Sequence, residues 1–403
     1  NWIKKSDCLF CSVGFLQFND QHEDFTLDDF FSLADGLQQQ QCQITDLTIS
    51  FAHQERFIDH DNKGLIAVIE ALQHPNCAVN DFHLEHQLNT HAIKALAGML
   101  KSPHCQINIF SLLGSNIDGD QFKHLAEAFA DRACKLTDLT IRDCNLDEKA
   151  MSVFAQVLQH QNTSLHDLDL SNNLIECKGL FTFANALQRE TSRVETLNLE
   201  CNKIGSAGAA ALADAMTSQH CKLKYLYLAE NKIGCAGAMA LADTIQTTHC
   251  KLTTLDLDYN HIGEKGAAAL AQSLSHIHCK ITHFSVSCND ARHTIFAAIA
   301  KALISKNSLL RSLSLRVNKV EISAINVLTA ALTSPDCQIE IFYLDAECIE
   351  HSGASSLIID TLSANTTLTS LRVSGDAMDD ASLNALIHLI QTDRCGVKYL
   401  AFD

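Results

Sequence analysis

The sequence predicts an α/β solenoid, in which short parallel strands alternate with helices in a stack of similar repeats. Two observations support this prediction. A pattern of the form Leu-x-x-Leu-x-Leu, with Ile or Val in place of some leucines, recurs every 29 residues from Ile107 to Val397. Each occurrence is followed by a segment with apolar residues at helical spacing. A constant period over this length is typical of a repeat architecture, and chance does not produce it.

The first half of each repeat predicts a short strand. In the segment that begins at Leu252, we expect Leu252, Leu255 and Leu257 to point into the core and the residues between them to point away from it. Three residues after the last leucine comes an asparagine, whose amide can satisfy buried loop backbone. This position holds Asn173, Asn202, Asn231, Asn260, Asn289 and Asn318, and in the outer repeats Cys144, Glu347 or Asp376. We therefore expect a ladder of asparagines in the central repeats.

The second half of each repeat predicts a helix, as in the alanine-rich segment 204–216. Gly208, Gly237 and Gly266 recur at one helical position, where we expect the helix to lie close to the strand layer. Parallel strands lie about 4.8 Å apart, whereas packed helices need about 10 Å. The stack should therefore curve into a horseshoe of about 14 repeats, with a concave parallel β-sheet and helices on the convex side.

A family resemblance rests on the segment from Cys221 to Gly234, with its leucines and Asn231. It resembles the ribonuclease-inhibitor-like subclass of leucine-rich repeats, and the resemblance extends from about Cys11 to Asp403. It implies a leucine-rich-repeat solenoid that binds protein on its curved surface. Members of the subclass include cytosolic inhibitors, sensor arms of immune receptors and secreted effectors of intracellular bacteria. The uniform repeat length and the scarcity of aromatic residues differ from the inhibitor, so inhibition of a ribonuclease is not implied.

The two ends of the chain are less regular. Residues 1–43 predict an N-terminal capping region with a weak first repeat, and residues 44–403 predict the leucine-rich-repeat solenoid. Within the cap, Thr26 and the acids Asp28 and Asp29 predict the start of a helix that runs to Leu37. Because the chain begins at Asn1, we expect a fragment or a processed form. At the other end, either the natural protein continues or Asp403 closes a minimal cap.

The composition restricts the function. The net charge is −17, which argues against nucleic acid and favours a protein partner with a basic surface. No apolar stretch approaches the roughly 20 residues that a membrane span needs. No catalytic nucleophile constellation and no phosphate-binding loop stand out. We therefore expect a monomer that is not an enzyme and binds no membrane and no small-molecule substrate.

Many of the 17 cysteines occupy one repeat position, two residues before the first strand leucine. They are Cys11, Cys42, Cys77, Cys105, Cys134, Cys221, Cys250, Cys279, Cys337 and Cys395. We interpret them as buried apolar residues of a reduced, cytoplasmic protein, in the host cytosol if it is a bacterial effector. The residues that precede four of them are His104, His220, His249 and His278. A metal or redox sensor is the alternative. Since we expect the cysteines to point inward and the histidines outward, we predict no metal and no other cofactor.

The candidate site is the outward face of the central repeats, which is acidic. Its acids are Asp138, Asp143, Asp167, Asp169, Glu195, Glu200, Glu230, Asp256 and Asp258, opposed by Arg142 and Lys224. Acidic charge steers a basic partner, and exposed tyrosine is a common anchor in protein interfaces. The predicted partner-binding residues are Asp143, Asp169, Glu200, Tyr225, Tyr227, Glu230, Asp256, Asp258 and Tyr259. An ordinary solvated acidic face is the competing interpretation.

The predicted function is that of a non-enzymatic protein–protein interaction module. The resemblance includes bacterial effectors, so a module that acts on a host protein fits this prediction. The residues leave two alternative functions open. One is the recognition arm of a larger enzyme or immune receptor. The other is a stoichiometric inhibitor of a basic enzyme.

Overall fold

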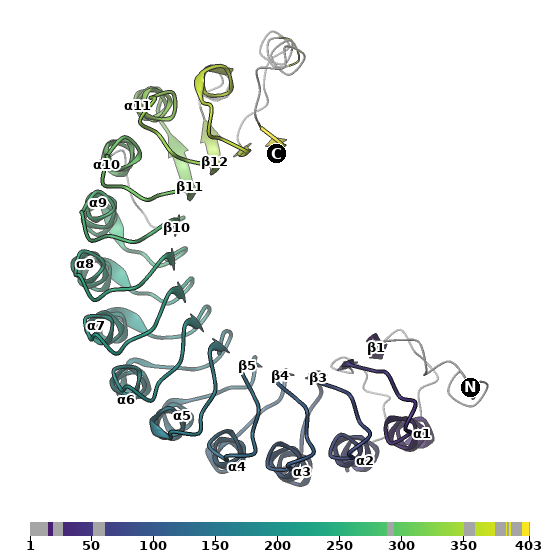
Figure 1. Ribbon diagram of the computed structural model, residues 1–403. Helices are drawn as coiled ribbons and strands as arrows, with labels where there is room; N and C mark the ends of the chain where they lie inside the picture. Colours follow the sequence, from purple (N-terminus) through teal and green to yellow (C-terminus); the bar gives the residue numbers. More distant parts are fainter. Residues whose placement is uncertain are drawn as a thin grey trace. The chain divides into compact units, whose positions relative to one another are not determined.

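The computed structural model describes residues 15–18, 27–50, 61–287, 294–349, 359–374, 384, 387 and 397–402. The chain divides into two compact units, Asn1–Asn202 (unit 1) and Lys203–Asp403 (unit 2). In each unit, parallel strands alternate with helices, and the helices cover one face of the sheet (Figure 1). The predicted boundary between a cap and the repeats at residue 43 stays a prediction.

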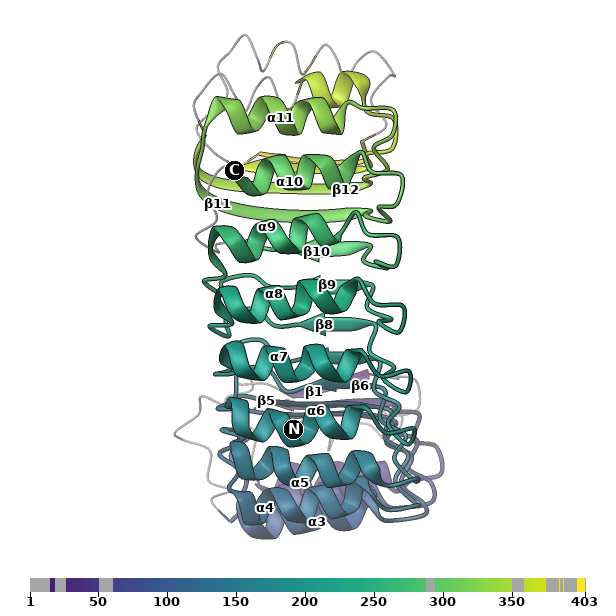
Figure 2. The same ribbon diagram turned by 90° about the vertical axis from the view of Figure 1, so that its left-hand side faces the viewer.

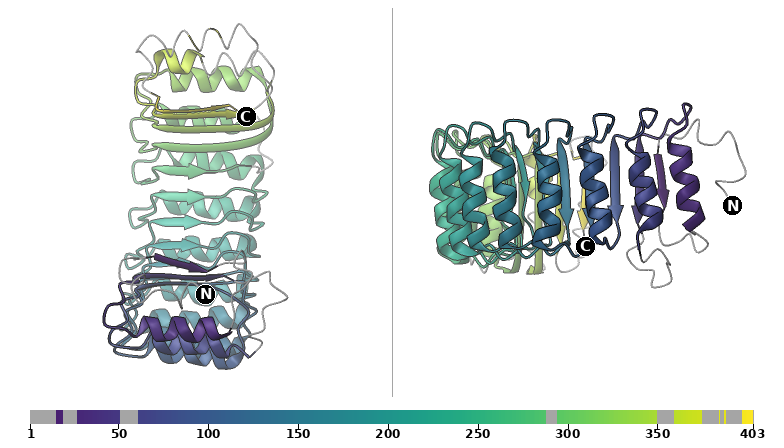
Figure 3. Two further views of the ribbon diagram at one scale, coloured as in Figure 1. Left: turned by 90° about the vertical axis from the view of Figure 1, so that its right-hand side faces the viewer. Right: turned by 90° about the horizontal axis from the view of Figure 1, so that it is seen from below.

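In unit 1, strands β1 to β7 are paired side by side in sequence order, and all pairs are parallel. The strands are β1 (Phe15–Phe18), β2 (Asp46–Ser50), β3 (Asp81–Glu85), β4 (Ile109–Leu113), β5 (Asp138–Arg142), β6 (Asp167–Asp169) and β7 (Thr196–Asn198). The helices are α1 (Leu27–Leu37), α2 (Lys63–Ala71), α3 (Thr90–Leu100), α4 (Gly119–Phe129), α5 (Glu148–Gln159) and α6 (Cys177–Leu187). Figure 3 shows these helices side by side in front of their strands.

Unit 2 has the same plan, with strands β8 to β14 paired in parallel in sequence order. The strands are β8 (Tyr225–Tyr227), β9 (Thr254–Asp256), β10 (His283–Ser285), β11 (Ser312–Val320), β12 (Ile341–Ile349), β13 (Ser370–Ser374) and β14 (Tyr399–Phe402). The helices are α7 (Gly205–Met216), α8 (Gly234–Ile245), α9 (Gly263–Ser273), α10 (Thr294–Leu303) and α11 (Ile322–Leu332). Figure 2 shows them stacked in sequence order on one side of the sheet.

The repeat pattern explains both the strand layer and the helix layer. In β8, Leu226 is fully buried under the helices, while Tyr225 on the opposite face is 40% exposed. The helix α1 begins and ends where the sequence predicts it. Helix α4 begins with a capping box, in which the Asp118 side chain accepts from the backbone N–H of Gln121 and the Gln121 side chain accepts from that of Asp118. The predicted α/β fold, in which parallel strands alternate with helices, is confirmed.

The asparagine ladder is present in the central repeats. The Nδ2 of Asn173 donates to the carbonyl oxygen of Ile141 at 2.8 Å, and its Oδ1 accepts from the backbone N–H groups of Cys144 and Leu146 at 3.1 and 3.0 Å. Asn260 makes the same type of contacts with the turn that contains Asn231. The amides take the carbonyls of Ile141 and Leu228, near the ends of β5 and β8, and the central strands β6 and β9 are three residues long.

Where the ladder position lacks asparagine, the structure uses other side chains or extends the strand. The Cys144 thiol donates to the carbonyl of Leu112, so cysteine continues the ladder that we expected to stop there. Asn318 lies within strand β11, so the predicted turn at this residue is wrong. The following repeat has Glu347 at the ladder position, and β11 and β12 pair on to Val320 and Ile349. Asn289 and Asp376 lie outside the described residues.

Of the recurring glycines, Gly237 and Gly266 pack against the neighbouring helix, so the prediction that they approach the strand layer is wrong for these two. A Cβ added at Gly237 in α8 would lie 3.0 Å from the Cβ of Ala209 and 3.2 Å from the Cα of Ser206, both in α7. A Cβ at Gly266 in α9 would lie 2.9 Å from the Cβ of Ala238 in α8. The missing side chains therefore set the close spacing between successive helices.

Candidate partner-binding face

The strand face of unit 2 brings three of the predicted residues together. Tyr225 and Tyr227 alternate with a buried leucine in β8, so both project from the same face of the sheet. In the parallel register, Tyr227 lies opposite Asp256 of β9, and Tyr225 lies opposite Thr254. We call Tyr225, Tyr227 and Asp256 the tyrosine face.

The side chains of the tyrosine face influence the pKa of Tyr227. Burial raises the pKa of the Tyr227 hydroxyl above its usual value, and the nearby Asp256 carboxylate and Tyr225 raise it further. Asp256 is held in place because its Oδ1 accepts from the backbone N–H of Asp258 at 2.9 Å. The face therefore presents two aromatic rings beside a carboxylate that its own turn holds in place.

Five predicted residues lie in the turns that follow the strands, although we assigned them to strand positions. They are Asp143, Glu200, Glu230, Asp258 and Tyr259. Asp143, Glu230 and Tyr259 have φ values of 54°, 56° and 55°, in the left-handed region. Their backbones still bond to the next repeat, since the N–H of Glu230 donates to the carbonyl of Asp258 at 2.9 Å and that of Tyr259 to the carbonyl of Ser287 at 2.8 Å. Glu230 and Tyr259 occupy the same position in successive repeats, and both are exposed.

Asp258 has an internal structural role. Its Oδ1 accepts from the Ser285 hydroxyl and from the backbone N–H of Ser287, both at 2.6 Å. These bonds fasten the turn after β9 to the next repeat. At least one oxygen of this carboxylate is therefore engaged within the protein.

The three predicted residues of unit 1 also differ from one another in exposure and in internal contacts. Asp143 is exposed in its turn, while Asp169 and Glu200 are half-buried. The Oδ1 of Asp169 accepts from the backbone N–H of Ser171 at 2.9 Å, as Asp256 does for its own turn. The carbonyl of Glu200 accepts from the backbone N–H of Asn172 at 2.9 Å. The carboxylate of Asp169 thus stabilises its own turn.

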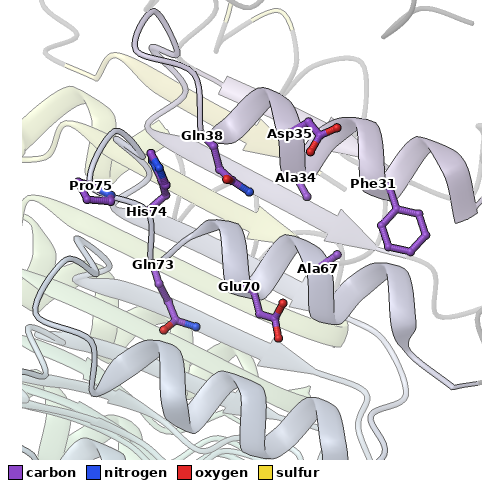
Figure 4. Close-up of a pocket in the computed structure, with 9 residues that line it drawn as sticks. All are labelled: Phe31, Ala34, Asp35, Gln38, Ala67, Glu70, Gln73, His74 and Pro75. Atoms are coloured by element: carbon purple, nitrogen blue, oxygen red, sulfur yellow. The ribbon is translucent and has the colours of Figure 1, made fainter.

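A shallow pocket of about 350 Å³ lies on the helix layer of unit 1, between α1 and α2 (Figure 4). Its lining residues are Phe31, Ala34, Asp35, Gln38, Ala67, Glu70, Gln73, His74 and Pro75. Side chains of mixed polarity line it, and none of the predicted site residues does so. We therefore keep the strand face as the candidate site.

The described cysteines of the recurring position are buried, as the sequence predicts. Burial raises the pKa of the thiols of Cys77, Cys134 and Cys279 to about 11. Such thiols stay protonated near neutral pH and are poor nucleophiles. Cys11 and Cys395 lie outside the described residues. His104, His220, His249 and His278 are exposed, and among the described residues they join no group of potential metal ligands.

A thiol reagent applied to the folded protein at about pH 8 should modify Cys177 and Cys235, which are partly exposed, long before Cys77, Cys134 and Cys279. The raised pKa keeps the buried thiols protonated at this pH, and burial blocks access. Peptide mass spectrometry after timed alkylation measures both groups, with urea-unfolded protein as the control. Equal alkylation rates for the two groups of cysteines in folded protein would contradict the burial of Cys77, Cys134 and Cys279.

Among the helices that the structure describes, none combines the length and the apolar character needed to cross a membrane.

Comparison with known proteins identifies the repeats. A family described as "Leucine Rich repeat" matches residues 161–184, 194–213, 219–242 and 248–271. The chain resembles the crystal structure of an internalin (inlF) from Listeria monocytogenes strain 4b F2365, with a TM-score of 0.41 and 16% identity over 77% of this chain and 78% of that chain. No curated protein sequence matches.

Proposed function

Because this chain carries leucine-rich repeats, which form protein–protein interaction modules, we propose that it is a non-enzymatic module that binds a basic segment of a partner protein on the tyrosine face. The observation behind this proposal is the juxtaposition of Tyr225 and Tyr227 with the Asp256 carboxylate on adjacent strands. An arginine or lysine side chain can lie over a tyrosine ring while it pairs with a carboxylate. The three side chains therefore suit a cationic side chain of the partner.

Neighbouring residues extend the proposed surface within unit 2. Tyr259 is 39% exposed and follows β9, and the exposed Glu230 precedes it by one repeat. Tyrosine contributes a large contact area at little conformational cost. In unit 1, Asp143, Asp169 and Glu200 add to the net charge of −17, which raises the rate of encounter with a basic protein.

We place the module in a reducing compartment such as the cytoplasm, or in the host cytosol if it is a bacterial effector. The support is that the cysteines which the structure describes are all free thiols. The ribonuclease-inhibitor-like subclass remains part of this proposal through the repeat sequence from Cys221 to Gly234.

Changing Tyr225 and Tyr259 to alanine together should weaken partner binding by at least about tenfold, because both rings expose a large apolar area. The full chain is used to capture a partner from cell lysate, and the affinity of the purified pair is then measured by calorimetry. Met239→Ala is the matched control, because Met239 is 46% exposed but lies on helix α8. Unchanged affinity in the folded double variant would contradict this site.

The same measurement separates the alternatives. Affinity for a basic partner should fall as salt screens the charges, over a Debye length of about 8 Å at physiological ionic strength. A captured enzyme whose activity stops at one equivalent of the chain would indicate a stoichiometric inhibitor. A salt-independent affinity would contradict recognition of a basic surface.

A further inference from the structure

A second cluster of polar side chains lies on the strand face of unit 1, outside the predicted site. Asp46 begins β2, and Asp81 begins β3 and lies directly opposite it in the parallel register. His83 follows two residues after Asp81, so strand alternation places it on the same face. One potential ligand atom from each of the three side chains lies within 4.8 Å of the other two.

Two oxygen atoms in this cluster lack a donor. The Oδ1 atoms of Asp46 and Asp81 are both buried, and neither has a hydrogen-bond partner among the described residues. The Nε2 of His83 lies 2.8 Å from the Oδ1 of Asp81, but this contact lacks hydrogen-bond geometry. Buried carboxylate oxygens are normally satisfied by a donor or a cation. The unsatisfied Oδ1 of Asp46 is therefore a reason, separate from proximity, to expect a ligand here.

The charge of the cluster points to a cation. Burial raises the pKa of the Asp81 carboxyl; His83 lowers it, while the negative charges of Asp46 and Asp138 raise it. Among the described residues, the ion pair within the cluster joins His83 to Asp81, and those of Lys and Arg join Asp61, Glu127 and Glu340 elsewhere. Two carboxylates thus face each other with a single imidazole to balance them.

We propose that Asp46, Asp81 and His83 bind a divalent transition-metal ion such as Zn²⁺. Zn²⁺ accepts mixed nitrogen and oxygen ligands, with bonds of about 2.0–2.2 Å. A tetrahedral ion with such bonds holds its ligand atoms roughly 3.3 Å apart. This separation lies between the 2.8 Å contact of His83 with Asp81 and the 4.8 Å limit of the cluster. The ligand atoms thus lie near the spacing that such an ion requires.

The ligand set selects the type of ion. Mg²⁺ and Ca²⁺ prefer oxygen ligands alone, whereas the imidazole nitrogen of His83 favours Zn²⁺, Co²⁺ or Ni²⁺. Three protein ligands leave a coordination position for water or for a donor atom of another molecule. All three residues are half-buried on the strand face.

Cobalt titration of the full-length chain tests the proposal, because bound Co²⁺ absorbs visible light in a way that reports its ligands. After treatment with a chelator, the wild-type chain should bind one Co²⁺ tightly, and Zn²⁺ should displace it. The variants His83→Ala and Asp81→Asn should each weaken this binding by at least about tenfold. His91→Ala is the control, because His91 is exposed on helix α3 and should leave the affinity unchanged.

A thermal melt with and without Zn²⁺ gives an independent readout. Wild type and His91→Ala should melt at a higher temperature with Zn²⁺, because the ion binds the folded state, and His83→Ala should show no such shift. Circular dichroism in chelator verifies that each variant is folded, and Asp46→Asn serves in place of any variant that is not. Wild-type cobalt affinity in His83→Ala and Asp81→Asn would overturn the proposal, as would the absence of a tight Co²⁺ site in wild type.

Discussion

Asn173→Ala should lower the free energy of unfolding by about 3–5 kcal/mol. The Asn173 side chain is buried, and its Nδ2 donates to the carbonyls of Ile141, Leu170 and Ser171 at 2.8, 3.0 and 3.0 Å. Its Oδ1 accepts the two backbone N–H groups of the preceding turn. Alanine would remove this partner from five backbone groups. The carbonyls of Leu170 and Ser171 keep another donor, so the loss falls mainly on the other three, and each unsatisfied group costs about 1–3 kcal/mol before relaxation.

Urea unfolding monitored by circular dichroism measures this loss. Asn162→Ala is the matched control, because Asn162 is exposed in the loop that precedes β6 and should change stability by less than about 0.5 kcal/mol. Asn173→Asp should also be destabilising, since a carboxylate cannot donate to the three carbonyls. A loss below about 1 kcal/mol for Asn173→Ala would show that the ladder contributes little to stability.

The repeat period predicts the fold because every repeat obeys the same constraints. Leucines at period two must face the core, and the buried amide must satisfy the turn, so strands, helices and the central ladder follow from the spacing. The length of each strand does not follow from one repeat, since it depends on the ladder residue of the next. Asn260 takes the carbonyl of Leu228, directly after the three-residue strand β8, whereas β11 continues past Asn318.

The candidate site is predicted less completely, because the contacts between neighbouring repeats are not visible in the sequence of one repeat. Tyr225, Tyr227 and Asp256 are placed correctly on one face, because strand alternation alone decides this. Glu230 and Tyr259 have left-handed backbone conformations in the turns after β8 and β9, and the alternation of a strand does not extend to them. Asp258 is recruited by Ser285 of the next strand, a contact that the spacing within one repeat cannot reveal.

The cluster of Asp46, Asp81 and His83 is missed by sequence reasoning because no motif joins its members. Asp46 and Asp81 are separated by 35 residues, in the part of the chain where the repeat length is irregular. Only the strand register brings the two carboxylates side by side. A pattern search within single repeats instead selects the histidines that precede the buried cysteines, which are exposed.

Phe154→Ala should destabilise unit 1 by about 3–5 kcal/mol, through the loss of buried apolar surface and the cavity left behind. Phe154 lies in α5 and is fully buried. Its ring centroid is 5.8 Å from those of Phe122 in α4 and Phe183 in α6, and both pairs are edge-to-face. One side chain therefore joins the helices of three successive repeats, and edge-to-face pairs add about 0.5–1.5 kcal/mol each beyond burial.

The pattern of unfolding distinguishes this role from a local packing defect. Because a repeat stack is held together by contacts between neighbours, removal of the Phe154 ring weakens two interfaces at once. Hydrogen exchange should therefore speed up in α4, α5 and α6 together, and the urea transition should shift to lower concentration. Phe181→Ala is the control, because Phe181 also lies in α6 but is 48% exposed, and its loss should change exchange little. Faster exchange confined to α5 would contradict the coupling, since the two neighbouring helices would then hold without the shared ring.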